Sequence, residues 1–345
     1  MDIREWAIIE NTFGINARAR VMVEYENTDE LSRALELYRK HYATLPLLHI
    51  GGGSNMLFIG DYPGVILHSR IGGIEVVAEE GDEILVRAGA GQVFDDFVGE
   101  TVSRGWYGLE NLSLIPGQVG AAAVQNIGAY GAEASQRIEM VEGLTLPEGK
   151  PIRMSAAECQ YGYRQSIFKQ SLRGRLAITH VIWRLSRSFH PKLDYGGIRQ
   201  AMERAGLKAD TLTAQELRQI IIGIRREKLP DPTELGSAGS FFMNPVVERS
   251  DYERLAAQYP AMPSYPADGE HVKLSAGWLI EQSGWKGRSL GQAAVHDRQA
   301  LVLVNLGGAT GLEILRLSES IRNDVHQRFG VELKPEVEII GSISA

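Results

Sequence analysis

The sequence has few of the features that mark exported, disulfide-linked or membrane-spanning proteins. Among its 345 residues there is one cysteine, Cys159, so no disulfide can form within the chain. The lack of disulfides is typical of a reducing compartment. The first six residues carry charges where a signal peptide needs an apolar run, and no later apolar stretch is long enough to cross a bilayer. We therefore expect a cytoplasmic monomer that does not depend on membranes.

Charge and histidine spacing exclude two further classes of protein. The net charge is −7, and the basic residues are scattered instead of forming a stripe that could follow a phosphate backbone. We therefore expect no nucleic acid partner. The 8 histidines show no metal-ligand spacing, so we expect no metal. The 38 glycines cluster at strand ends, where they permit either a close approach to a ligand or ordinary turns.

Short apolar runs alternate with segments of helical periodicity, which favours an α+β fold. After Thr28 and Asp29, apolar residues at helical spacing from Leu31 to Tyr38 predict a helix. Strands are predicted at residues 47–50, 56–59, 65–67, 74–77 and 84–86. Further helices are predicted through Phe94 and Val98 and around residues 217–224 and 312–325.

The domain organisation is predicted from the polar stretch that begins at Arg187. We expect a first domain over residues 1–187, with subdomains of about 1–67 and 68–187. A second α+β domain is expected over residues 188–345, and its last strand is expected to return to the first domain.

Several familiar site motifs are absent. After Gly51 and Gly53, Met56 stands where a dinucleotide fingerprint needs its third glycine, and a strand is expected there in place of a helix. No serine lies in a Gly-x-Ser-x-Gly elbow, and Gly149-Lys150 continues into proline without the hydroxyl residue of a phosphate loop. A Rossmann domain, an α/β-hydrolase and a P-loop nucleotidase are therefore disfavoured.

Several other motifs together carry a resemblance. They are Asn-Thr-Phe-Gly at 11–14, Gly-Gly-Gly-Ser-Asn at 51–55, the run from Gly108 to Gly117, Asn-Ile-Gly-Ala-Tyr-Gly at 126–131, Tyr-Gly-Tyr-Arg at 161–164, Gly-Ser-Phe-Phe at 239–242 and Lys-Pro-Glu-Val at 334–337. With these motifs in this order, the chain resembles the long-insert type of UDP-N-acetylenolpyruvoylglucosamine reductase. The resemblance implies a PCMH-type FAD-binding fold, as in vanillyl-alcohol oxidase, of two α+β subdomains, followed by a substrate-binding domain.

The resemblance also implies non-covalent FAD, bound mainly by the first half of the chain. Glycines let backbone N–H groups approach a pyrophosphate closely, so the 51–55 turn suits that role. The implied cofactor-binding residues are Asn11, Thr12, Ile50, Gly51, Gly52, Gly53, Ser54, Asn55, Ile115, Pro116, Gly117, Gly120, Ala121, Asn126, Gly128, Ala129, Tyr130 and Gly131. Tyr130 is equally consistent with core packing. Ala121 and Ala122 replace hydroxyl residues of some relatives, so one cofactor hydrogen bond is expected to be missing or made by the backbone.

Three catalytic residues are implied by matching motifs. Arg164 matches the arginine placed against the substrate carboxylate, where a planar fork of donors suits two oxygens. Ser240 matches the proton donor, and Glu336 matches its acidic partner. Without the resemblance these three would be interpreted as a surface arginine, a loop serine and a solvated acid.

Three substrate-binding residues are implied in the same way. Tyr195, followed by two glycines, matches the tyrosine that closes over the substrate in the extra segment of the long type. Lys228 and Asn244 match residues that contact diphosphate and uridine.

The implied activity is reduction of the enolpyruvyl ether of UDP-N-acetylglucosamine to UDP-N-acetylmuramate, a peptidoglycan precursor, with NADPH as hydride donor. Three alternatives stay open: a flavin oxidase on the same fold, a nucleotide-sugar binding protein without activity, and a hydrolase that uses Ser240. The hydrolase ranks last because no histidine base stands in a recognisable motif.

Overall fold

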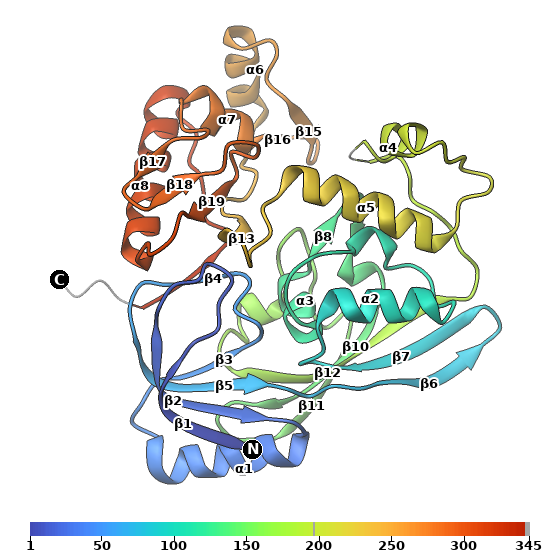
Figure 1. The fold of residues 1–345 in the computed structure, drawn as a ribbon, viewed down its shortest axis with the longest axis vertical. Helices are drawn as coiled ribbons and strands as arrows, with labels where there is room; N and C mark the ends of the chain where they lie inside the picture. The colour runs from blue at the N-terminus through green and yellow to red at the C-terminus, as the bar shows by residue number, and fades with distance from the viewer. Residues whose placement is uncertain (196, 342–345) are drawn as a thin grey trace. The chain divides into compact units, whose positions relative to one another are not determined.

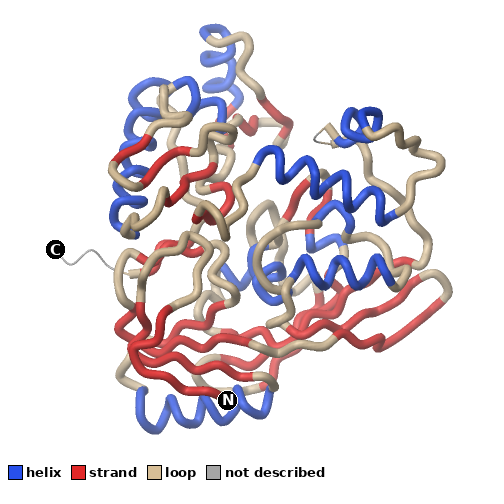
Figure 2. The backbone as a smooth tube through the Cα atoms, in the orientation of Figure 1, coloured by secondary structure: helices blue, strands red, loops and turns tan. Residues whose placement is uncertain are grey.

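The computed structural model describes residues 1–195 and 197–341, which form runs of strands with helices between them (Figure 2). Gly196, one of the two glycines after Tyr195, lies outside the described residues. The chain forms two compact units. Unit 1 comprises residues 1–7, 19–52 and 63–227, and unit 2 comprises residues 8–18, 53–62 and 228–345. Within the described residues, no helix is both long and apolar enough to cross a membrane.

Unit 1 begins with a four-stranded sheet in the order β1-β2-β5-β3 (Figure 1). Its strands are β1 (Asp2–Ile8), β2 (Arg18–Tyr25), β3 (Leu47–Ile50) and β5 (Tyr62–Ser69), and β3 runs parallel to β5. Helix α1 (Thr28–Leu37) buries Leu31 and Leu35 against Val23 and Val65 of this sheet. The Asn27 side chain caps the helix by accepting from the Glu30 N–H, and a π-helical turn, η1 (Tyr38–Tyr42), follows.

A second sheet of unit 1 carries its largest core. It is antiparallel, in the order β11-β10-β12-β7-β6. The strands are β6 (Ile74–Glu80), β7 (Glu83–Gly89), β10 (Ile138–Thr145), β11 (Pro151–Ser155) and β12 (Leu176–Ser186). Helices α2 (Phe94–Ser103) and α3 (Val119–Gln125) lie along this sheet (Figure 1). Phe94 and Phe97 of α2 contact Trp183 of β12, so the three rings fix the helix on the sheet.

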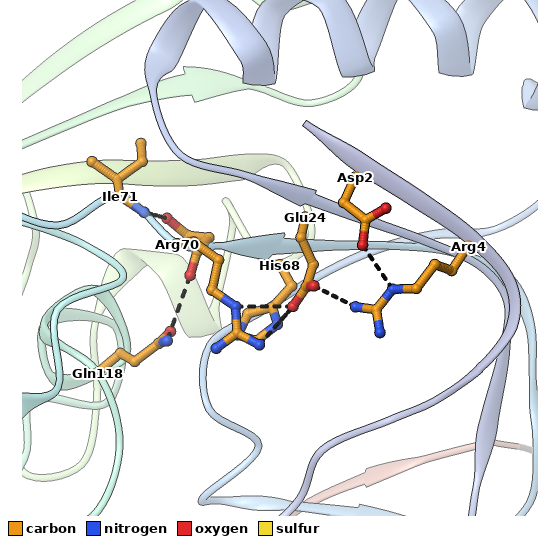
Figure 3. Close-up of polar contacts among 8 residues, drawn as sticks. Asp2, Arg4, Glu24, His68, Arg70, Ile71 and Gln118 are labelled. Atoms are coloured by element: carbon orange, nitrogen blue, oxygen red, sulfur yellow. Dashed lines mark hydrogen bonds and ion pairs between the residues drawn. The ribbon is translucent and has the colours of Figure 1, made fainter.

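A charged cluster beside the first sheet shows how unit 1 accommodates an inward-facing carboxylate (Figure 3). Glu24 lies 2.6 Å from Arg70 Nη2 and 3.1 Å from His68 Nδ1, and it also pairs with Arg4. Burial raises the pKa of the Glu24 carboxyl, but the hydrogen bond and charges of Arg70, with those of Arg4 and His68, outweigh burial and lower it below its ordinary value.

The last part of unit 1 has a small core of its own. Helices α4 (Ile198–Arg204) and α5 (Ala214–Lys228) bury Ile198, Leu217 and Ile221 together with Leu193. Tyr130, from a short hairpin of β8 (Gly128–Ala129) and β9 (Ala132–Glu133), packs against this cluster. The remaining elements of unit 1 are the single 3₁₀ turns η2 (Glu110–Leu112), η3 (Ala134–Gln136) and η4 (Ile167–Lys169).

The described residues of unit 2 form three small sheets. The largest has the order β13-β19-β18-β17, formed by β13 (Gly236–Ser240), β17 (Ser289–Leu290), β18 (Ala293–Val295) and β19 (Val302–Asn305). It packs with helix α8 (Gly311–Phe329), and α8 in turn contacts α7 (Ala276–Gln282). A second sheet, β14 (Val246–Glu248), β16 (His271–Leu274) and β15 (Ser264–Pro266), packs with α6 (Arg249–Gln258). The final strand β20 (Glu338–Ile340) runs parallel to β4 (Met56–Phe58).

The compact units divide the chain at places other than the predicted domain boundary. The sequence analysis placed that boundary after residue 187, whereas the third and longest segment of unit 1 continues to Glu227. Unit 2 also includes two segments from the first quarter of the sequence. The predicted domains therefore stay a prediction, and the site is described below within each compact unit.

A glycine at the start of β13 yields a stability prediction. A side chain at Gly236 would place its Cβ 2.2 Å from the Phe13 carbonyl oxygen, a backbone atom that cannot turn aside. We expect Gly236→Ala to lower the free energy of unfolding by at least about 1–3 kcal/mol. Gly223, exposed in α5 with no atom within 4 Å of its would-be Cβ, is the matched control. Gly223→Ala should add about 0.5–1 kcal/mol. Urea unfolding of both variants checks this, and equal midpoints would contradict it.

Candidate active site

In unit 1 the first two glycines of the 51–55 turn face the segment that leads into α3. A Cβ at Gly51 would lie 3.1 Å from Gln118 Oε1 and 3.3 Å from the Ala121 Cβ. At Gly52 the nearest atoms would be Gln118 Cγ at 3.9 Å and the Gly117 Cα at 4.0 Å. Two stretches that the sequence analysis assigned to FAD are thus brought together, with partly exposed glycines on one of them.

Gln118 lies beside these glycines and provides a test of whether they suit a cofactor. Its side chain is 6% exposed, and its Nε2 donates a long hydrogen bond of 3.5 Å to the Ser69 carbonyl (Figure 3). Its Oε1 is buried and has no hydrogen-bond partner within the part of the chain that the structure describes. FAD carries both hydroxyl donors and a pyrophosphate, so an open acceptor next to side-chain-free backbone fits this group.

Two other residues predicted to bind cofactor have structural roles of their own. A Cβ at Gly120 would come within 2.8 Å of the Ala90 Cβ, so glycine is needed there for α3 to approach β7. Asn126 is fully buried in a left-handed conformation at the end of α3. Its Nδ2 donates to Glu133 and to the Gly162 carbonyl, and its Oδ1 accepts from the Ser135 N–H.

The rest of the glycine turn belongs to unit 2, where it contacts the segment around Asn11 and Thr12. Gly53 has φ +63°, and a Cβ on it would lie 2.4 Å from the Glu10 carbonyl oxygen, so only glycine fits. Thr12 donates from its N–H to Gly53 O and from its hydroxyl to Ser54 O, both at 3.4 Å. The Asn11 side chain bonds to backbone groups of Ile9 and Ile15 and so stabilises its own loop.

Arg164 is held by the loop of residues 126–131 in unit 1. Its Nη2 donates to the Gly128 carbonyl at 2.8 Å, and its Nη1 lies 3.5 Å from the Asn126 carbonyl. A Cβ at Gly128 would be 3.0 Å from Nη1, so this glycine lets the guanidinium approach the backbone. Arg164 itself has φ +55°, an uncommon conformation that orients the side chain at the tip of its loop.

Tyr130, Gly131 and Tyr195 meet on the other side of the same loop. The would-be Cβ of Gly131, at φ +78°, lies 3.4 Å from the Tyr195 Cβ. Tyr195 is 56% exposed, whereas Tyr130 is half-buried. Burial raises the pKa of the Tyr130 phenol, Tyr195 raises it further and Arg225 lowers it, so the phenol is neutral at physiological pH.

In unit 2, Ser240 and Glu336 lie on neighbouring backbone segments. The Glu336 N–H donates to the Phe241 carbonyl at 2.8 Å, and the Met243 N–H donates to Lys334 O at 3.0 Å. Ser240 ends β13 after a shift in register, and Gly239 before it has φ +69°. Such a bulge re-aims a side chain at the end of a strand and is common next to active sites.

Asn55 joins the glycine turn to this pair of segments. Its Nδ2 donates to the Glu336 carbonyl at 3.1 Å, and its own carbonyl accepts from the Glu338 N–H at 2.9 Å. The structure therefore brings Asn55, Glu336 and the residue after Ser240 together within unit 2.

The remaining predicted site residues lie on the surface, in the core or at the start of a helix. Lys228 is exposed at the end of α5. The Asn244 Oδ1 accepts from the Ala276 N–H at 3.0 Å, at the start of α7. Ile50 is buried at the end of β3, Ile115 and Ala129 pack against the large core, and Pro116 is exposed.

The sequence analysis assigned no role to two residues that contact this region in unit 1, Asn111 and Arg225, and it included Gln118 only as part of a stretch expected to line the cofactor. Arg225 is a partly buried cation whose Nε donates to the Leu114 carbonyl at 3.1 Å, and burial lowers the pKa of its guanidinium. In the sequence, Arg225 follows the periodic apolar residues of α5 and has the pattern of a solvent-facing arginine. No local signal distinguishes it.

Comparison with known proteins decides the family. Residues 231–340 match the C-terminal domain of UDP-N-acetylenolpyruvoylglucosamine reductase, and residues 19–155 match an FAD-binding domain. The chain is 54% identical to the UDP-N-acetylenolpyruvoylglucosamine reductase of Bacteroides fragilis over 96% of its length and 97% of that protein. The chain belongs to this reductase family. The protein of the same name from Burkholderia multivorans is 48% identical, over 94% of this chain and 93% of that one.

Solved structures agree on the fold. The UDP-N-acetylenolpyruvylglucosamine reductase of Thermus caldophilus superposes with a TM-score of 0.64 at 24% identity, covering 96% of each chain. The 6-hydroxy-D-nicotine oxidase of Arthrobacter nicotinovorans gives 0.52 at 12% identity, over 96% of this chain and 86% of that one. The predicted α+β, PCMH-type FAD-binding fold and the predicted family are confirmed. The protein is an FAD-dependent oxidoreductase of the reductase family.

Gly52 offers a way to separate cofactor binding from folding. An alanine methyl there would make ordinary contacts at 3.9 and 4.0 Å, so we expect Gly52→Ala to change the stability of the FAD-free protein by less than about 0.5 kcal/mol. If the backbone of Gly52 lies against the cofactor, the FAD dissociation constant should rise about tenfold or more. Titration of FAD-free protein by flavin fluorescence measures this, and an unchanged constant would remove Gly52 from the FAD site.

Proposed function

We propose that the protein reduces the enolpyruvyl ether of UDP-N-acetylglucosamine to UDP-N-acetylmuramate, with NADPH as the hydride donor. The relatives' printed name supports the substrate, because the family is shown along almost the whole chain. A cytoplasmic location and a monomeric state belong to the same proposal. So does the assignment of Tyr195, Lys228 and Asn244 to the nucleotide sugar.

The observation that most supports this function is the backbone pairing of residues 241–243 with residues 334–336. In this pairing the carbonyl of Phe241, the residue after Ser240, accepts a hydrogen bond from the Glu336 N–H. A hydroxyl residue and a carboxylate residue from segments almost a hundred residues apart thereby have their backbones on adjacent segments. This is the arrangement that a proton donor and its acidic partner require.

FAD, when bound, would supply the hydride chemistry that links the nicotinamide to the enolpyruvyl methylene carbon. Hydride addition leaves negative charge on the adjacent carbon, which is delocalised into the substrate carboxylate. Arg164 would bind that carboxylate, because its guanidinium is fixed by two backbone carbonyls and needs little reorganisation. Glu336 would help to stabilise the same charge, as an acid or through a bound water.

Ser240 would then give its proton to the carbon. A hydroxyl is a very weak acid, but a carbanion is a very strong base, so this transfer is feasible when a neighbouring group stabilises the alkoxide. The bulge at Gly239 supports the assignment, because it sets the direction of the Ser240 side chain independently of the regular alternation along β13.

Separate measurement of the two half-reactions tests this proposal. Under anaerobic conditions, NADPH should bleach the flavin of the native protein, and the enolpyruvyl nucleotide sugar should then restore its absorbance promptly. Flavin that bleaches but is not reoxidised by this sugar would remove the substrate assignment. Rapid oxygen consumption without the sugar would point instead to an oxidase on the same fold.

Ser240→Ala should affect only one of these steps. We expect reduction of the flavin by NADPH to stay within about twofold of native, while reoxidation by substrate slows by about 10²–10⁴-fold, the usual contribution of a general acid. Stopped-flow absorbance measures both rates. Ser237→Ala, on the same strand, is the matched control and should change neither rate. Equal damage to both half-reactions in Ser240→Ala would exclude Ser240 as the proton donor.

A further inference from the structure

Asn111 is a buried side chain that connects two loops of unit 1. It lies in η2 and is 4% exposed. Its Nδ2 donates to the Tyr130 carbonyl at 2.8 Å and to the Lys192 carbonyl at 3.0 Å. Because both partners are carbonyl oxygens, the atom that faces them must be the amide nitrogen, and its two hydrogens are both used.

The two carbonyls belong to segments to which the proposed function gives different tasks. Tyr130 is in the loop whose Gly128 carbonyl holds Arg164. Lys192 is three residues before Tyr195, at the start of the segment that carries this tyrosine. One amide group therefore fixes the backbone of both segments at the place where they meet.

The surroundings of Tyr195 show why this connection matters. Leu193 is buried in the small core of α4 and α5, so the backbone just before Tyr195 is anchored. The Tyr195 side chain is 56% exposed and lies beside Gly131, on which an added Cβ would be 3.4 Å from the Tyr195 Cβ. The position of Tyr195 thus depends on where Lys192 and the 130–131 turn are held.

We propose that Asn111 is a positioning residue that holds the Tyr195 segment against the Arg164 loop and thereby sets the affinity for the nucleotide sugar. The inference rests on the proposed function, in which Tyr195 covers the substrate. Asn111 touches neither substrate nor flavin in this proposal and acts through the two carbonyls. Its effect is therefore expected on substrate binding, whereas reduction of the flavin by NADPH is not expected to depend on it.

Asn111→Asp is the sharpest variant, because it keeps the shape of the side chain and replaces the donor by an oxygen. That oxygen would face two carbonyl oxygens at 2.8 and 3.0 Å, so both bonds are lost and repulsion is added. Asn305→Asp is the matched control in unit 2, where the buried Asn305 amide donates to the Phe13 carbonyl at 2.9 Å. Asn111→Ala serves if the aspartate variant does not fold.

A double-mutant cycle with Tyr195→Ala tests the proposal on the holoenzyme. We expect Asn111→Asp to raise KM for the enolpyruvyl nucleotide sugar about 5- to 30-fold, as for the loss of a buried hydrogen-bonding group, with flavin reduction by NADPH within about twofold of native. The double variant should have the KM of Tyr195→Ala, because Asn111 acts through Tyr195. Fully additive effects, or an unchanged KM in Asn111→Asp beside a raised KM in Tyr195→Ala, would overturn the proposal. Asn305→Asp should lower stability without raising KM.

Hydrogen exchange without substrate separates this inference from the proposed function. Amides of residues 192–195 should exchange at least about tenfold faster in Asn111→Asp than in native protein or Asn305→Asp. Unchanged exchange would overturn the anchoring role. If Tyr195→Ala leaves KM unchanged, the substrate role of Tyr195 falls, and with it the effect on affinity. Faster exchange would then still support the anchoring itself.

Discussion

The candidate site depends on backbone running where side chains cannot fit. Gly53 leaves no room for a methyl group beside the Glu10 carbonyl, and Gly51 has Gln118 and Ala121 at contact distance. This turn therefore follows a path that excludes a side chain at Gly53 and leaves little room for one at Gly51. The same constraint recurs at Gly128, where the missing side chain admits the guanidinium of Arg164. Glycine placement, more than charge, sets the shape of the site within each unit.

Side-chain amides hold the irregular segments in place. Asn126 and Asn111 in unit 1 and Asn55 in unit 2 each donate to carbonyls of loops distant in sequence. Loops leave backbone groups without partners, and burying such a group unpaired costs free energy. An asparagine amide satisfies these carbonyls and fixes the loop at once. This explains why several polar residues in the motifs expected to bind ligands form their hydrogen bonds with the protein itself.

Local structure was predictable from sequence where apolar pattern alone determines it. The run at residues 47–50 became β3 (Leu47–Ile50), and periodicity around residues 312–325 became part of α8 (Gly311–Phe329). Helix α1 begins at Thr28, close to the predicted start. Its cap was not predicted, because it consists of one hydrogen bond in which the Asn27 side chain accepts from the Glu30 N–H. The pairing of Phe242 with Pro335 joins segments far apart in the chain, and no local pattern specifies such a register. The motif resemblance pointed to Ser240 and Glu336. It also includes Asn111, but neither Asn111 nor Arg225 has a local pattern that assigns it a role, because their hydrogen bonds to distant carbonyls arise only in the fold.

The interleaving of the two compact units limits how this gene product could be divided or exchanged. Unit 2 is assembled from three separate stretches, and two of them interrupt unit 1 near its start. A fragment that stops near residue 227 would keep residues 8–18 and 53–62 but lose most of the structure on which they fold, including the partner strand of β4. A single recombination crossover between the genes of two relatives, placed between residues 62 and 228, would likewise combine parts of unit 2 from both parents. The architecture is therefore inherited as a whole, and either half alone is a poor choice for expression.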